Sequence, residues 1–159
     1  MIALQNLHTH SIWCDGKDSI EDMTLHAIEL GFDSVGFSGH SPMFYAPIHG
    51  MKPEEVEDYL LDVRSIQKKY ADKIKVFCGI ELDLYSKLDL TPYDYVIGSV
   101  HVVTHNETAH TDVDHSANVA WNGINTYFDG DPYAYAEAYY ALVADVVRQT
   151  NADLIGHFD

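Results

Sequence analysis

Short apolar runs alternate with amphipathic segments along the 159 residues, and this alternation most constrains the fold. Strands that alternate with helices are typical of βαβ units, in which neighbouring strands run parallel. The sequence therefore predicts an α/β fold built on a parallel sheet. The apolar runs that predict strands cover residues 2–7, 34–37, part of 74–84, 93–100 and 153–156.

The segments between these runs have the features of helices. Ser19 has the residue type of an N-cap and is followed by acidic residues, while Gly31 has the residue type of a C-cap. Further helices are predicted over residues 53–70 and 133–149. We expect the polar stretch from 102 to 131 to be a long loop, of the kind that is usually functional or mobile.

Two histidines, His8 and His10, follow the first predicted strand. In an extended chain, residues two apart project from the same face, so these imidazoles form a preorganised chelate for a divalent metal. The later predicted strands, and the loop after the first one, supply further residues of ligand type: Asp15, His40, Glu81, His101 and His157.

One histidine after a strand is more often a core or surface residue than a ligand, but five such strand ends are hard to attribute to chance. The carboxyl ends of parallel strands lie on one face of a sheet or barrel. We therefore predict a metal site on that face. Imidazole and carboxylate groups accept zinc, iron and manganese alike, so the residues do not identify the metal.

Composition excludes several classes of partner. The chain has 25 acidic and 9 basic residues and a formal net charge of −16. Such a surface repels phosphate backbones and anionic lipids, so we expect neither a nucleic-acid nor a membrane partner. No run approaches the roughly 18 apolar residues of a membrane span, and no signal peptide is recognisable. We expect a cytoplasmic protein, whose oligomeric state the sequence does not indicate.

Six short motifs, in this order, resemble those of the PHP (polymerase and histidinol phosphatase) superfamily, and most closely its monofunctional histidinol-phosphate phosphatases. The motifs are LHTHS (7–11), CDG (14–16), FSGHS (37–41), GIE (79–81), GSVH (98–101) and IGHFD (155–159).

The resemblance implies a distorted (β/α)7 barrel similar to a TIM barrel. Here we expect an incomplete barrel of about five β/α units, with residues 1–159 forming the N-terminal portion of a single PHP domain. The family barrel has further units and a final Asp-x-His motif, which we expect beyond Asp159, as we do a phosphate-binding arginine. On this interpretation, the 159 residues alone are not a competent catalyst.

The resemblance also implies three divalent metals, which are zinc, iron or manganese, at the carboxyl ends of the strands. Glu81 would bridge two of them, because its two oxygens can bind adjacent cations while offsetting their repulsion. The implied ligand sets are His8, His10 and Glu81 for the first metal; Glu81, His101 and His157 for the second; and Asp15 and His40 for the third.

The implied activity is hydrolysis of L-histidinol phosphate to L-histidinol and phosphate, in histidine biosynthesis. A metal-bridging water held by Glu81 would attack phosphorus, and the other catalytic side chains would lie beyond Asp159. Two alternatives stay open at this point. One is a phosphoesterase that acts on another small phosphate ester, a nucleotide or a phosphotyrosine protein. The other is a non-catalytic fragment that binds metal or a partner.

Overall fold

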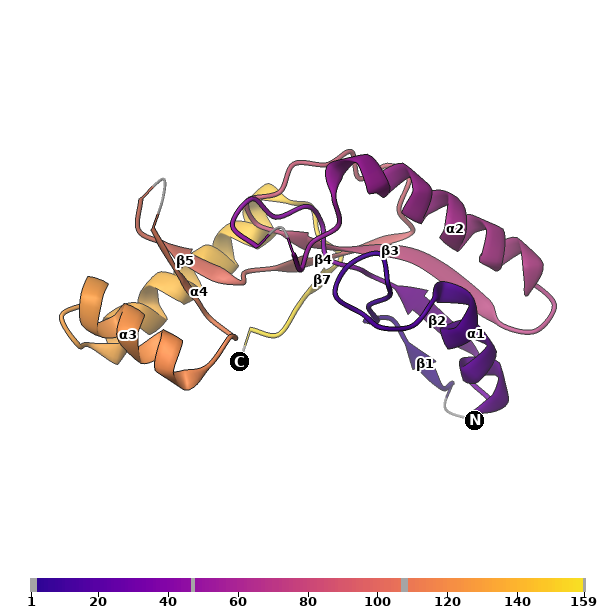
Figure 1. Ribbon diagram of the computed structural model, residues 1–159, viewed down its shortest axis with the longest axis horizontal. Coiled ribbons are helices and arrows are strands. Elements are labelled where there is room, and N and C mark those ends of the chain that lie inside the picture. Colours follow the sequence, from indigo (N-terminus) through magenta and orange to yellow (C-terminus); the bar gives the residue numbers. More distant parts are fainter. Residues whose placement is uncertain (1–2, 47, 107–108, 159) are drawn as a thin grey trace.

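The computed structural model describes residues 3–46, 48–106 and 109–158, and within them five parallel strands form one open sheet (Figure 1). All the pairings between neighbouring strands of this sheet are parallel, which confirms the predicted α/β fold. The strands, in their order across the sheet, are β1 (Gln5–Asn6), β2 (Ser34–Phe37), β3 (Lys75–Asp83), β4 (Tyr95–Ser99) and β7 (Leu154–Ile155).

Helices lie in three of the four connections between these strands, the exception being the connection from β3 to β4. Helix α1 (Ile20–Glu29) begins after Ser19, whose hydroxyl accepts a hydrogen bond from the backbone N–H of Asp22, as the N-cap prediction requires. A short 3-10 turn, η1 (Pro53–Glu55), leads into α2 (Val56–Lys69), in agreement with the helix predicted over residues 53–70. The last helix, α4 (Pro132–Gln149), contacts β4.

Tyr59 of α2 fixes this helix to the centre of the sheet. It is fully buried, and its hydroxyl lies 2.8 Å from the carbonyl oxygens of both Phe37 and Gly79. These carbonyls belong to β2 and β3, so one side chain connects the helix to two neighbouring strands. Apolar side chains of α1, α2 and the two strands complete this core, including Ile20, Val35, Phe37, Val63, Ile66, Val76 and Ile80.

The prediction of a long loop over residues 102–131 was wrong. This segment contains an antiparallel hairpin of β5 (Val102–Thr104) and β6 (His110–Asp112), followed by α3 (Ala117–Tyr127). The hairpin begins with three β-branched residues, which favour strands. Ser116 caps α3 by accepting a hydrogen bond from the Val119 N–H, which is a helix signal that the prediction overlooked.

Two strand boundaries differ from the predictions. β1 is much shorter than the run 2–7, whose first residue lies outside the described part of the chain. β3 continues to Asp83, so Glu81 lies within the strand rather than at its end. In the described part of the chain, no helix has both the length and the apolar character that a membrane crossing needs.

Candidate metal centre

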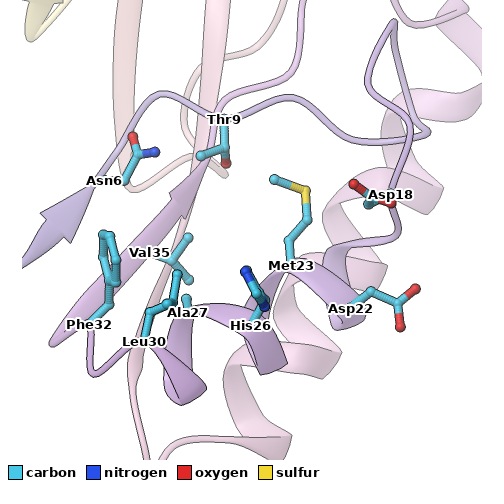
Figure 2. A pocket seen from close by; sticks show the side chains of 10 residues that line it. All are labelled: Asn6, Thr9, Asp18, Asp22, Met23, His26, Ala27, Leu30, Phe32 and Val35. Atoms are coloured by element: carbon cyan, nitrogen blue, oxygen red, sulfur yellow. The ribbon is translucent and has the colours of Figure 1, made fainter.

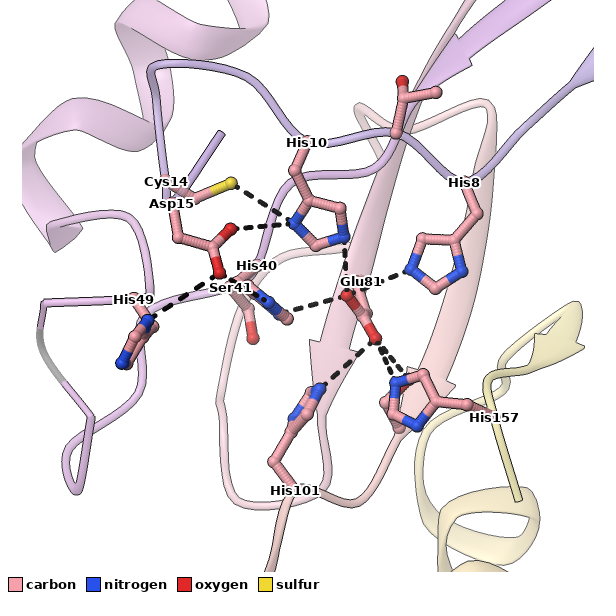
Figure 3. A network of polar contacts seen from close by, with 12 residues as sticks. His8, His10, Cys14, Asp15, His40, Ser41, His49, Glu81, His101 and His157 are labelled. Carbon is pink, nitrogen blue, oxygen red and sulfur yellow. Dashed lines mark hydrogen bonds and ion pairs between the residues drawn. The ribbon is translucent and has the colours of Figure 1, made fainter. Parts of the chain in front are cut away.

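Glu81 of β3 lies at the centre of the predicted site (Figure 3). Its strand is paired with β4, and an isolated parallel bridge joins Glu81 to His40 on the other side. The residue is 1% exposed. A carboxylate this deeply buried is stable only with partners of opposite charge or with hydrogen-bond donors, so the groups around each oxygen define what the site can bind.

Three imidazoles surround the Oε2 oxygen of Glu81. The Nε2 atoms of His8 and His10 each lie 3.2 Å from it, and the Nδ1 atom of His40 lies 3.0 Å from it. Despite this proximity, neither Oε2 nor His40 Nδ1 forms a hydrogen bond with any described residue. Imidazole and carboxylate atoms that converge on one point are the arrangement expected of metal ligands.

The Oε1 oxygen faces a second group of side chains. Ser99 donates its hydroxyl hydrogen to Oε1 over 2.8 Å. The Nε2 atoms of His157 and His101 lie 2.9 and 3.3 Å from the same oxygen. The two oxygens of Glu81 therefore have different imidazole partners, which fits a carboxylate shared between two cations.

Asp15 connects a third group to the cluster. One of its oxygens lies 3.2 Å from His10 Nδ1, and the other lies 3.6 Å from His40 Nε2 and 3.7 Å from His49 Nδ1. Within the described chain, three groups have ligand atoms that all lie within 4.8 Å of one another. They are His8, His10 and Glu81; His10, Asp15 and His40; and His40, Glu81 and His101.

The structure thus brings together all seven residues that the sequence singled out. The first group has the composition that the resemblance implies for one metal. In the other two groups, His40 lies beside Glu81 and His101 as well as beside Asp15. His157 is in none of these three groups, but its Nε2 atom lies 2.9 Å from Glu81 Oε1.

Three neighbouring side chains were not predicted. Asp83 Oδ2 lies 3.2 Å from His101 Nδ1, and Tyr45 donates its hydroxyl hydrogen to the same oxygen. Asp83 follows Glu81 by two residues on β3, and this period-two spacing is the sequence signal that would have found it. Cys14 Sγ lies 3.5 Å from His10 Nδ1.

The cluster shifts the pKa values of its own members. Burial alone raises the pKa of Glu81, but the adjacent imidazoles of His10, His101 and His157 outweigh burial and hold the pKa well below its usual range. Burial lowers the pKa of His101, but the neighbouring carboxylates of Asp83 and Glu81 have the larger, opposite effect. The net result is a pKa raised from 6.5 to about 9. The metal-free cluster therefore retains protons near neutral pH, and a bound metal has to displace them.

A pocket of about 320 Å³ opens beside the cluster, and Asp15, His40 and His101 form part of its wall. The other side chains around it come from the loop after β2 and from the segment that begins with β6: Met43, Tyr45, Ala46, His49, Asp112, Asp114 and His115. Neither lysine nor arginine is found among the described residues of this wall.

A larger hollow of about 460 Å³ lies between α1 and strands β1 and β2 (Figure 2). Its wall is formed largely by apolar residues such as Met23, Leu30, Phe32 and Val35, with Asp22 and His26 at one side. None of the seven predicted ligands is among the described residues that line it, so size alone does not identify the chemical site.

Comparison with known proteins agrees with these observations. A family model described as the PHP domain matches residues 6–159. A Deinococcus radiodurans protein named "Probable histidinol-phosphatase" is 28% identical over 175 residues, covering 100% of this chain and 62% of that protein. A Schizosaccharomyces pombe protein of the same name is 27% identical, covering 96% of this chain and 54% of that protein. The chain thus spans little more than half of each relative.

The fold also has a match among solved structures. The histidinol phosphate phosphatase of Lactococcus lactis, solved in complex with zinc, L-histidinol and phosphate, superimposes with a TM-score of 0.69. The sequences are 22% identical, and the match covers 98% of this chain but 57% of that one. The five parallel strands therefore correspond to part of a larger α/β fold, in agreement with the incomplete barrel that we expected.

Proposed function

The chain belongs to the PHP domain family, and on this premise we propose that it forms the metal-binding part of an enzyme that hydrolyses phosphate monoesters with the help of divalent metals. The position of Glu81 is the observation that supports this most directly. One buried carboxylate has imidazole nitrogens within 3.3 Å of each of its oxygens, and three of the atoms involved have no hydrogen-bond partner among the described residues.

In this proposal the metal ligands are the residues predicted from the sequence, arranged around Glu81 as a bridge. When bound, divalent metals supply positive charge to the phosphoryl oxygens and lower the pKa of an attacking water. The carboxylate of Glu81 offsets the repulsion between neighbouring cations, while Ser99 restrains its Oε1 oxygen. The proposed ligands are His8, His10, Asp15, His40, Glu81, His101 and His157, for up to three ions of zinc, iron or manganese.

L-Histidinol phosphate is the substrate that we propose, and the pocket beside the cluster supports it. Asp112 and Asp114 line this pocket, whereas no lysine or arginine is among its described lining residues. Once metals neutralise the phosphate, these carboxylates favour an ester whose remaining part is cationic. L-Histidinol phosphate has an amine and an imidazole, whereas a nucleotide offers no amine of comparable charge.

Release of inorganic phosphate by the complete enzyme that contains these residues tests the proposal. We would compare L-histidinol phosphate, p-nitrophenyl phosphate and a nucleoside monophosphate, each with added zinc, manganese or iron(II) and after chelation. We expect the highest kcat/KM for L-histidinol phosphate and loss of activity on chelation. A higher kcat/KM for the nucleotide would favour the alternative phosphoesterase. Absence of phosphate release from every ester with every metal would contradict the proposed activity.

A further inference from the structure

Asp83 is a buried carboxylate with no part in the proposed metal shells, yet it contacts one of their members. It is 1% exposed and follows Glu81 by two residues on β3, so both side chains project from the same face of the sheet. Its Oδ2 oxygen lies 3.2 Å from His101 Nδ1. The other ring nitrogen of His101, Nε2, lies 3.3 Å from Glu81 Oε1.

The surroundings of Asp83 hold its carboxylate in this position. Tyr45, from the loop between β2 and η1, donates its hydroxyl hydrogen to Oδ2. The Oδ1 oxygen accepts a hydrogen bond from the backbone N–H of Tyr85 over 2.9 Å. The Asp83 N–H donates to Ser41 Oγ over 3.0 Å. Both carboxylate oxygens therefore have partners, and the side chain has little freedom to turn away from His101.

We propose that Asp83 is a positioning residue for the metal ligand His101, and that Tyr45 acts through Asp83. A carboxylate that accepts the Nδ1 hydrogen of an imidazole fixes its tautomer and leaves the Nε2 lone pair available to a metal. In this structure, that arrangement directs Nε2 towards the bridging oxygen of Glu81. The inference rests on the proposed metal site, but the tautomer of His101 is a property of the chain itself.

Tyr45 extends this arrangement to the pocket. Its ring lines the pocket, and its centroid lies 5.5 Å from that of His110 on β6. The hydroxyl contacts Asp83, which contacts His101. One tyrosine thus connects the pocket wall to a metal ligand, so that loss of its hydroxyl has an effect at His101 without any direct contact.

The test compares Asp83→Asn and Tyr45→Phe with Tyr85→Phe. Tyr85 is a matched control, because its hydroxyl pairs with Thr104 Oγ1 at 2.9 Å and not with Asp83. We would measure zinc affinity by competition with a chromophoric chelator. We expect Asp83→Asn to weaken the affinity of the site that includes His101 by about 10- to 100-fold, the effect typical of such partners. Tyr45→Phe should have a smaller effect in the same direction, and Tyr85→Phe none.

A second readout separates positioning from a general structural role. Histidine ¹⁵N spectra of the metal-free protein, recorded above the His101 pKa of about 9, report which ring nitrogen holds the hydrogen. We expect the Nδ1–H form in the wild type and a shift towards Nε2–H in Asp83→Asn, whose amide can donate to Nδ1. Unchanged zinc affinity together with an unchanged tautomer would overturn the inference.

The two readouts also distinguish this inference from the proposed function. If the wild type binds zinc and the variants bind it more weakly, positioning holds even when no phosphate ester is hydrolysed. If the wild type binds neither zinc, manganese nor iron(II), the proposed function fails, and the His101 tautomer alone decides whether Asp83 positions the ring. Should Asp83→Asn not fold, Tyr45→Phe tests the same contact from the partly exposed loop.

Discussion

The carboxyl edge of the parallel sheet and the segment from β5 to α3 meet at one pocket but contribute to it differently. The sheet edge supplies buried groups: Glu81 lies within β3, which pairs with β4, and the pocket-lining His101 follows the end of β4 by two residues. The hairpin and the turn after it supply Asp112, Asp114 and His115, which are partly or largely exposed. In the proposed function, we infer that the sheet determines the chemistry, whereas the segment outside the sheet selects the substrate.

The largest effect is expected at the sheet edge, from Glu81→Gln. The amide has nearly the same shape but no negative charge, so it leaves several imidazoles without a shared anion. We expect metal affinity to fall by more than about 100-fold, the upper end of the range for outer partners. Metal content after dialysis, measured by elemental analysis, checks this.

Glu29→Gln is the matched control, because the Glu29 side chain is 75% exposed on α1. It should bind the same amount of metal as the wild type. Retention of the full metal content by Glu81→Gln would contradict the role of the sheet edge in metal binding, because the buried carboxylate would then not be a ligand.

A smaller effect is expected at the second region, from the double variant Asp112→Asn and Asp114→Asn. Hydrogen bonds to charged groups contribute about 1.5–3 kcal/mol, so KM for L-histidinol phosphate should rise by about 10-fold or more. KM for p-nitrophenyl phosphate and the metal content should not change. Steady-state kinetics with both esters measure this difference.

Asp72→Asn, in the turn after α2, controls for the loss of a surface charge. Equal increases in KM for both esters in the double variant would mean that the two acids do not distinguish the substrates. The inference that the hairpin selects the substrate while the sheet determines the chemistry would then be wrong.

Tyr59→Phe should affect the sheet without affecting the site. Its hydroxyl is the donor to two strand carbonyls, and the buried oxygens would lose this partner. We expect a loss of about 1–2 kcal/mol in the free energy of unfolding, with unchanged metal affinity. Urea denaturation measures it, with Tyr140→Phe as the control, since Tyr140 is 52% exposed. A loss of metal affinity in Tyr59→Phe would instead show that the site and the core are coupled.

The sequence predicted the sheet edge well because its signals are local. Apolar runs, the Ser19 cap and the strand ends bearing histidines each depend on a few consecutive residues. Parallel pairing then brings the strand ends together without further information. The family resemblance added the bridging role of Glu81, which no spacing in the chain indicates.

The hairpin and the outer partners were missed for a different reason. Residues 102–131 are largely polar, and β5 and β6 have three residues each, too few for a periodic pattern. The formation of these strands depends on tertiary packing, for example of Thr111 on β6 against Gly123 on α3. A methyl group added at Gly123 would clash with the Thr111 side chain. The contact between Tyr45 and Asp83 joins residues 38 apart in the sequence, and nothing local predicts it.

The smallest expected effect is a pH dependence of the metal-free protein. His101 has a pKa of about 9 in the folded state against an ordinary value of 6.5, and the pKa of His157 is also raised. Their contribution to stability is therefore fully present below about pH 6.5 and is lost as the pH rises through 9. The pKa of His10 is raised in the same direction, to about 10, whereas the pKa of the neighbouring Cys14 thiol is lowered.

We expect the Tm of the metal-free protein to fall by a few degrees between these two pH values, and that of the zinc-loaded protein to change less. Differential scanning calorimetry at several pH values measures both. A Tm that rises over this interval without metal would contradict the assigned shifts.

Anomalous diffraction at the zinc edge, from crystals of the zinc-loaded protein, tests the bridging role of Glu81 most directly. This bridging role predicts anomalous peaks about 2.0–2.2 Å from both carboxylate oxygens. One peak should lie beside His8 and His10, and another beside His101. A single peak that contacts only one oxygen, or peaks remote from Glu81, would contradict it.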